Sequence, residues 1–160
     1  MVKINSFNPI ENIDAEILIL GTMPGCASLN AGQYYAHRQN VFWRIISELL
    51  NLEASSLYEL KVQAVKSAGI AVWDVLQSCM REGSLDSMID ANSLITNDFY
   101  TFFQHHRKIK HVFFNGAKAE SYFTKYVLSS IDKGDLTFAR LPSTSPANAS
   151  MSYERKLNAW

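Results

Sequence analysis

Four short apolar segments, separated by stretches with helical spacing, constrain the fold of this 160-residue chain more than any other feature. Their apolar residues are continuous, and turn residues follow, which is typical of strands buried on both faces of a parallel sheet. They cover residues 16–20, 69–76, 111–114 and 136–140. The pattern predicts an α/β chain, a three-layer α/β/α fold with a central four-stranded parallel sheet, as one domain over residues 1–160.

Helices are expected between these strands and after the last one. The spacing of apolar residues predicts them over 40–50, from 56 to just before 69, over 94–105, after 116 and from about 152. Asn40 is expected to cap the first helix, and Ser56 with Glu59 has the spacing of a capping box. The loops after the strands then meet at the carboxyl edge of the sheet, where such folds bind ligands.

Composition excludes several other classes. Hydrophobic residues make up 48% of the chain and charged residues 19%, which is unlike a disordered protein. The formal net charge is zero, so any attraction to DNA must be local. Two cysteines are too few for a four-thiolate iron–sulfur cluster. No apolar run approaches the length of a membrane span and no signal peptide is recognisable, so we expect a cytoplasmic protein without a membrane partner.

The connection over residues 21–43 is much longer than an ordinary loop between a strand and a helix. Tyr34 and Tyr35 are aromatic side chains within it, against which a nucleobase could stack. Asn40 could donate through its amide nitrogen while its oxygen caps the helix, or it could be a cap alone. An ordinary surface connection is the alternative for the whole segment.

Polar residues also follow two other predicted strands. Asp74 could accept an N–H group of a bound base, or it could stabilise a turn. The segment 141–150 combines prolines with hydroxyl side chains, which suits a rigid loop that holds a phosphate, with a plain surface loop as the alternative. Residues 81–86 are expected to form a lid or surface turn. The charged run 105–111 lacks the spacing of a metal site and is expected to be a solvated helix end.

Several of these segments resemble motifs of the uracil-DNA glycosylase superfamily. Residues 21–25 (GTMPG) are similar to the Gly-Ile-Asn-Pro-Gly turn of its mismatch-specific branch, and residues 36–43 to an Ala-His-Pro-x-Asn-x-Phe-Trp stretch. Within the superfamily, the chain most resembles the hypoxanthine-DNA glycosylase (DNA-deoxyinosine glycosylase) family. The similar segments are GTMPGCASL, QYYAH, NVFW, WDVLQSC, GSLD and LPSTSPA.

The resemblance implies a monofunctional enzyme of base excision repair that flips out a deaminated base, hypoxanthine or uracil, and hydrolyses its N-glycosidic bond. DNA containing such a base is the implied partner, with no metal and no cofactor, and we expect a monomer. Catalysis is expected from Asn40 and the backbone of Met23. The expected base-binding residues are Gly21, Tyr34, Tyr35, Trp73 and Asp74. The expected DNA-binding residues are Ser143, Ser145 and Asn148.

Two departures from the superfamily pattern bear on mechanism. Met23 stands where the superfamily has an Asp or Asn that positions water, and a thioether cannot do so. Leu141 stands where the second motif begins with His or Asn. The departures favour stabilisation of the leaving base by Asn40 and backbone amides. Two alternatives stay open, a G·T or G·U mismatch glycosylase and a catalytically silent nucleotide- or DNA-binding domain of the same fold.

Overall fold

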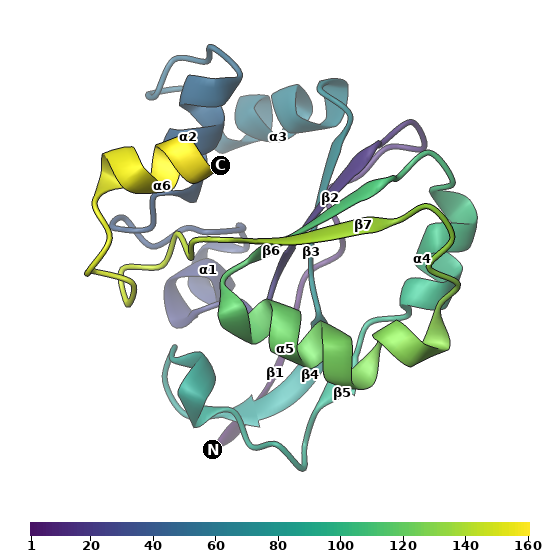
Figure 1. Ribbon diagram of the computed structural model, residues 1–160. Coiled ribbons are helices and arrows are strands. Elements are labelled where there is room, and N and C mark those ends of the chain that lie inside the picture. Colours follow the sequence, from purple (N-terminus) through teal and green to yellow (C-terminus); the bar gives the residue numbers. More distant parts are fainter.

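A computed structural model describes residues 1–160 and contains two sheets (Figure 1). The larger sheet is parallel, with the strand order β3-β2-β6-β7. Its strands are β2 (Ile17–Gly21), β3 (Ile70–Asp74), β6 (His111–Asn115) and β7 (Thr137–Leu141). The predicted four-stranded parallel sheet in an α/β fold is therefore confirmed.

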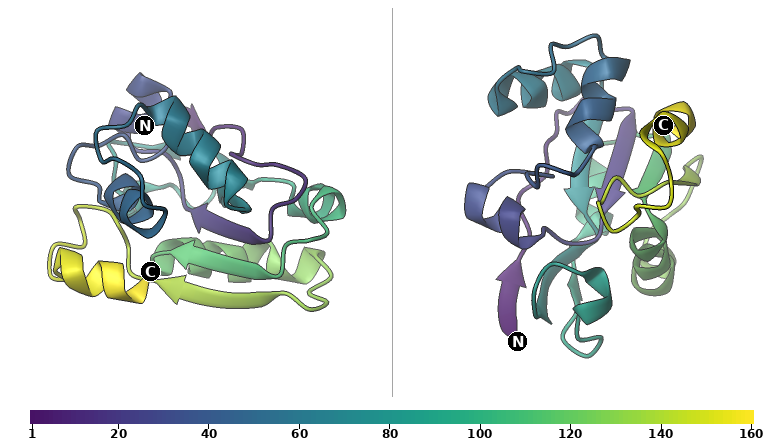
Figure 2. Two further views of the ribbon diagram at one scale, coloured as in Figure 1. Left: turned by 90° about the horizontal axis from the view of Figure 1, so that it is seen from above. Right: turned by 90° about the vertical axis from the view of Figure 1, so that its left-hand side faces the viewer.

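Helices cover both faces of this sheet, as Figures 1 and 2 show. Successive strand residues point to opposite faces, so Leu18 and Leu20 of β2 enter one core cluster and Ile19 enters the other. The first cluster includes side chains of α4 (Phe99–His105) and α5 (Ala117–Tyr126). The second cluster is packed by α2 (Phe42–Leu49), α3 (Tyr58–Ser67) and Trp160, which follows α6 (Tyr153–Ala159).

A second, antiparallel sheet was not predicted. It has the order β1-β4-β5 and consists of β1 (Val2–Asn5), β4 (Leu76–Arg81) and β5 (Ile95–Thr96). The predicted strand 69–76 is thus wrong beyond Asp74, because the chain leaves the parallel sheet there. The buried Asn97 fixes this junction, since its side-chain amide donates to the carbonyl oxygen of Asp74 at 2.8 Å.

Several predicted helix starts are corrected. The helix expected from residue 94 begins only at Phe99, where the Asp98 side chain accepts from the Thr101 N–H. The predicted capping box is absent, because α3 begins at Tyr58 after Leu57. The helix α2 has Val41 rather than Asn40 at its N-cap position.

Three short helical segments lie within connections between the main elements. The charged run 105–111 is not solvated throughout. The segment α1 (Cys26–Ala31) lies inside the predicted long loop, and single turns of 3₁₀-helix are η1 (Asp86–Met88) and η2 (Leu128–Ser130). Within the charged run, His106 is buried, with its Nε2 2.6 Å from the Glu11 carboxylate. None of the helices is both long and apolar enough to cross a membrane.

The carboxyl ends of the parallel strands are in register with one another. Gly21 pairs with Asp74, and Asn115 pairs with Leu141. The sheet therefore ends in a row of backbone and side-chain groups that faces the loops after β2, β6 and β7. This is the edge at which the sequence predicts a functional site.

Candidate active site

A cavity of about 550 Å³ opens at this carboxyl edge of the parallel sheet. Its walls come from the segments after β2, β4 and β7, together with the ends of β3 and β6. Most of the predicted site residues line it, namely Gly21, Met23, Tyr34, Tyr35, Asn40, Asp74, Ser143 and Ser145. Trp73 and Asn148 do not line it.

Close packing around Gly21 shapes the inner end of the cavity. A Cβ atom on Gly21 would lie 2.5 Å from Oδ1 of Asp74 and 2.8 Å from the hydroxyl oxygen of Tyr35. Both distances are far below van der Waals contact, so only glycine leaves room for these two groups. The carboxyl and the phenol therefore lie together above the end of β2.

Asp74 is a buried carboxyl with an unused acceptor. Its side chain is buried, and Oδ2 has no hydrogen-bond partner in the chain. Burial and, to a smaller extent, the charge of Asp86 raise the pKa of Asp74, and Arg81 opposes them, so that the pKa is about 7. Near neutral pH this carboxyl can therefore exist in either protonation state.

Tyr35 presents its hydroxyl rather than its ring face. Its backbone lies in the left-handed region, with φ of 53°, which is uncommon for a residue with a side chain. One face of the ring is covered by Phe42, at a centroid distance of 4.0 Å. The buried hydroxyl has no partner with hydrogen-bond geometry, although the Asn115 side chain lies near it. Burial and the charge of Asp74 raise the pKa of Tyr35, and Asn115 opposes this shift. The phenol thus remains a neutral donor.

Tyr34 is mainly a structural residue. Its hydroxyl donates to the carbonyl oxygen of Asn8 at 2.8 Å, and its ring meets Phe7 edge-on. Its own carbonyl accepts from the indole N–H of Trp43 at 2.7 Å. The stacking platform expected from the two tyrosines is therefore not an open pair of rings.

The turn after β2 supplies backbone donors. The N–H groups of Thr22, Met23 and Gly25 donate to no atom of the chain. The Met23 side chain is buried and belongs to a core cluster, although the residue lines the cavity. This arrangement is consistent with the predicted backbone role of Met23.

In the Asn40 side chain, the amide oxygen makes a hydrogen bond and the amide nitrogen makes none. Its Oδ1 accepts the N–H of Phe42, the first residue of α2, at 2.9 Å. Its Nδ2 makes no hydrogen bond within the chain, and the residue lines the cavity. Asn40 thus holds the first turn of α2 from the residue before the N-cap, and its amide nitrogen stays available as a donor.

A reciprocal hydrogen-bonded pair fixes the last loop. The Asn115 side-chain amide donates to the Thr144 hydroxyl at 2.9 Å, and the Thr144 N–H donates back to Asn115 at 2.9 Å. No role could be assigned to Asn115 from the sequence, because its partner lies 29 residues away. Asn148 donates to the Ser143 carbonyl at 3.1 Å, so it stabilises the loop from within and lies outside the cavity.

The prediction for Trp73 is corrected for a simple geometric reason. Neighbouring residues of a strand point to opposite faces, so the side chains of Trp73 and Asp74 cannot both face the cavity. The Trp73 ring packs within 5.0 Å of the rings of Phe99 and Phe102 in the core, and its N–H donates to Phe7. Trp73 is thus a core residue.

Sequence reasoning also missed the segment after β4. Arg81 was expected in a lid or surface turn, yet it is the last residue of β4 and its side chain is fully buried. Asp86, which carried no assigned role, lines the cavity. No group of three or more His, Cys, Asp or Glu residues is placed to hold a metal ion.

The cavity lies at the carboxyl edge of a parallel sheet, where α/β proteins of this kind bind their ligands, so the fold and the site define an α/β protein with a candidate ligand site. Comparison with known proteins agrees with this class. The family model described as "Uracil DNA glycosylase superfamily" matches residues 9–160. The chain belongs to the uracil DNA glycosylase superfamily.

Individual relatives give further detail. A hypoxanthine DNA glycosylase of Methanosarcina barkeri is 34% identical over 139 residues, covering 81% of this chain and 87% of the relative. A protein of the same name from Methanosarcina acetivorans is 35% identical over 123 residues, covering 76% of each chain. A solution NMR structure of a candidate uracil DNA glycosylase from M. acetivorans has 31% identity and a TM-score of 0.79, covering 98% of this chain and 94% of that one.

The substitution Asp74→Asn should change how stability depends on pH. The folded-state pKa of about 7 exceeds the ordinary value of 3.8, so the wild-type free energy of unfolding should fall as pH rises between these values. Asn is neutral throughout, so the free energy of unfolding of the variant should rise relative to that of the wild type by on the order of 4 kcal/mol as pH increases across this range. Urea unfolding at several pH values measures this, with the exposed Asp135→Asn as control. A difference independent of pH would contradict the burial effect.

Proposed function

We propose that this protein is a DNA glycosylase that hydrolyses the N-glycosidic bond of hypoxanthine in DNA. One observation carries the proposal: Oδ2 of Asp74 and the hydroxyl of Tyr35 are both buried, unpartnered and part of one cavity. Buried polar groups normally find partners, and leaving one unpaired destabilises the protein by about 1–3 kcal/mol. A ligand with matching groups would satisfy both.

The edge of hypoxanthine has those groups. Its lactam presents an N–H donor beside a carbonyl acceptor, so Asp74 can accept from N1–H while Tyr35 donates to O6. Adenine presents the reverse order, an acceptor ring nitrogen beside an amino donor, so its ring nitrogen would face an acceptor whenever Asp74 is ionised. Uracil carries a lactam edge too, and it is the second candidate base because the same pair of groups fits it.

The same cavity can stabilise the leaving base. A glycosylase flips its target nucleotide out of the duplex, and the glycosidic bond then breaks through an oxocarbenium-like sugar. Electron density moves onto the departing base in this step. The free amide nitrogen of Asn40 and the unused N–H groups of Thr22 and Met23 supply hydrogen-bond donors for that charge.

The last loop is proposed to hold the DNA backbone. The hydroxyl oxygens of Ser143 and Ser145 accept backbone N–H groups two residues further on, which leaves their hydroxyl hydrogens free to donate. Both residues line the cavity, and the pair of Asn115 and Thr144 keeps the loop in place. Hydroxyl and backbone donors of this kind commonly bind phosphates.

Single-turnover assays on defined duplexes test the proposed function. We expect base release from a duplex containing inosine, with uracil and G·T duplexes and an undamaged duplex compared under the same conditions. Release from the inosine duplex at the highest rate supports the proposal. Preference for a G·T or G·U pair would identify a mismatch glycosylase, and binding without release from any duplex would identify a catalytically silent domain.

The substitution Tyr35→Phe should raise stability and lower activity. It removes a buried hydroxyl without a partner, so the free energy of unfolding should rise by about 1–3 kcal/mol. It also removes the proposed donor to O6, so the single-turnover rate on inosine should fall about tenfold, which corresponds to ~1.4 kcal/mol. Tyr34→Phe is the matched control, because its hydroxyl is satisfied by Asn8 and its loss should reduce stability instead. Unchanged activity in Tyr35→Phe would remove Tyr35 from base recognition.

The substitution Asn40→Asp separates capping from catalysis. An Asp oxygen can accept the Phe42 N–H as the Asn oxygen does, so folding and melting temperature should be retained. The amide donor is lost, and we expect the single-turnover rate to fall about tenfold or more. The exposed Asn92→Asp serves as a control for the added charge. Full activity in Asn40→Asp would leave Asn40 as a capping residue only.

A further inference from the structure

A second carboxyl lines the cavity and has no part in the base contacts described above. Asp86 begins the short helix η1, in the segment that links β4 to β5. About a third of its side chain is exposed, whereas Asp74 is buried. The cavity thus holds one carboxyl at its inner end and one that water can reach.

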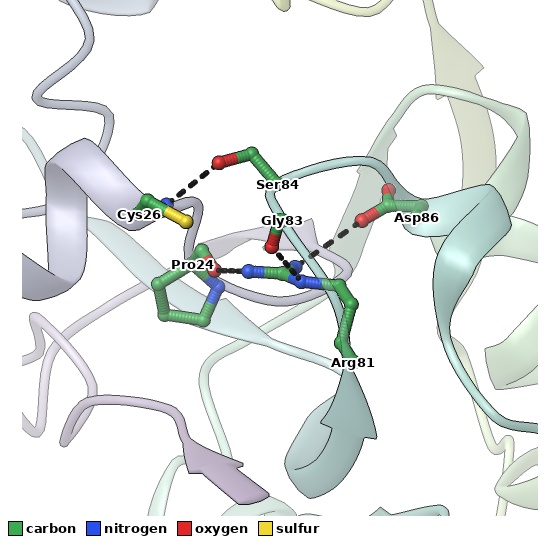
Figure 3. A network of polar contacts seen from close by, with 6 residues as sticks. All are labelled: Pro24, Cys26, Arg81, Gly83, Ser84 and Asp86. Carbon is green, nitrogen blue, oxygen red and sulfur yellow. Dashed lines mark hydrogen bonds and ion pairs between the residues drawn. The ribbon is translucent and has the colours of Figure 1, made fainter. Parts of the chain in front are cut away.

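A buried arginine fixes the segment that carries Asp86. Nη2 of Arg81 donates to the carbonyl oxygen of Pro24 at 2.5 Å, and Nε donates to that of Gly83 at 2.9 Å (Figure 3). The Ser84 hydroxyl also accepts the N–H of Cys26 at 2.9 Å. These contacts join the segment after β4 to the turn after β2, and hydrogen bonds from a charged donor are among the stronger ones. Asp86 is therefore held in a defined place relative to the turn.

Arg81 does not occupy the carboxylate of Asp86. Nη1 of Arg81 lies 3.9 Å from Oδ1 of Asp86, which is an ion pair without a hydrogen bond, and Nη1 has no hydrogen-bond partner. Arg81 therefore occupies neither carboxylate oxygen with a hydrogen bond, while its guanidinium charge favours the ionised form. Burial raises the pKa of Asp86, and the Thr22 hydroxyl, Arg81 and Lys118 oppose this shift.

The proposed reaction needs such a group. Cleavage of the glycosidic bond develops positive charge on the sugar and consumes a water molecule. Asp74 is assigned to the base edge, and the Met23 side chain offers no group that takes up a proton. Asp86 is the remaining carboxyl that lines the cavity, and it is the one that water reaches.

We propose that Asp86 accepts a proton from the water that attacks the sugar. The inference rests on the proposed glycosylase function. The water oxygen forms a bond to C1′ of the sugar, the glycosidic bond breaks with its electron pair remaining on the base, and the water proton moves to the Asp86 carboxylate. The same negative charge stabilises the cationic sugar as it develops.

The substitution Asp86→Asn tests this role, because it keeps the shape and removes the proton acceptor. On whichever damaged duplex the wild type cleaves, we expect the single-turnover rate to fall about 100-fold or more, the usual range for loss of a general base. The dissociation constant for that duplex should be unchanged or lower, since a negative charge near phosphates is removed. Glu82→Gln is the matched control, an exposed acidic residue of the same segment that does not line the cavity.

A purely structural role for Asp86 gives different results. It predicts a lower melting temperature and weaker DNA binding in Asp86→Asn, in proportion to any loss of rate. A second variant, Asp86→Ala, makes room for an external carboxylate, and added formate should restore part of its rate if Asp86 accepts the proton. Wild-type rates in Asp86→Asn, or no rescue by formate in a folded Asp86→Ala protein, would overturn the inference. Absence of cleavage by the wild type would instead contradict the proposed function itself.

Discussion

The register between β2 and β3 is the constraint on which the cavity depends. It places Gly21 beside Asp74 at the last pair of the parallel ladder, where the missing side chain of Gly21 leaves space for the carboxyl and for the phenol of Tyr35. The carboxyl is thereby removed from water while Oδ2 keeps no partner. This destabilises the free protein, and the two core clusters on either face of the sheet offset it. A bound lactam would donate a hydrogen bond to the carboxyl and remove this destabilisation. A ligand without such a donor would not, so the proposed cavity favours lactams.

The parallel sheet could be predicted from the sequence because its strands are buried on both faces and read as continuous apolar runs. The antiparallel sheet could not. Leu76–Arg81 follows β3 after a single residue, Val75, with no glycine or proline to mark the change of direction. The strand β5 has only two residues, and β1 is mostly exposed, so neither has a pattern that distinguishes it from a loop.

Residues of the candidate site could be predicted where they lie at the end of a strand or in an unusually long connection. Gly21, Asp74 and Asn40 were found in this way, and all three line the cavity. Trp73 was misplaced because sequence proximity to Asp74 ignores the alternation of side chains along a strand. Arg81 and Asp86 were predicted only as parts of a lid or surface turn, because their neighbours in the sequence indicate neither the burial of Arg81 nor the position of Asp86 on the cavity. Their importance depends on a contact between Arg81 and Pro24, which are 57 residues apart and meet only in the folded chain.

Two carboxyls in a cavity proposed to bind DNA, a polyanion, require an explanation in a chain whose net charge is zero. Burial disfavours the ionised form of Asp74, and the buried guanidinium of Arg81 lies beside Asp86. The negative charge that meets the DNA in the ground state is therefore smaller than the count of carboxyls suggests. When the glycosidic bond breaks, positive charge appears on the sugar, and the carboxylate of Asp86 would then interact favourably with that charge. An interaction that strengthens as the reaction proceeds lowers the barrier without requiring tight binding of undamaged DNA. Uniform positive charge would do the opposite, because it would bind every phosphate equally.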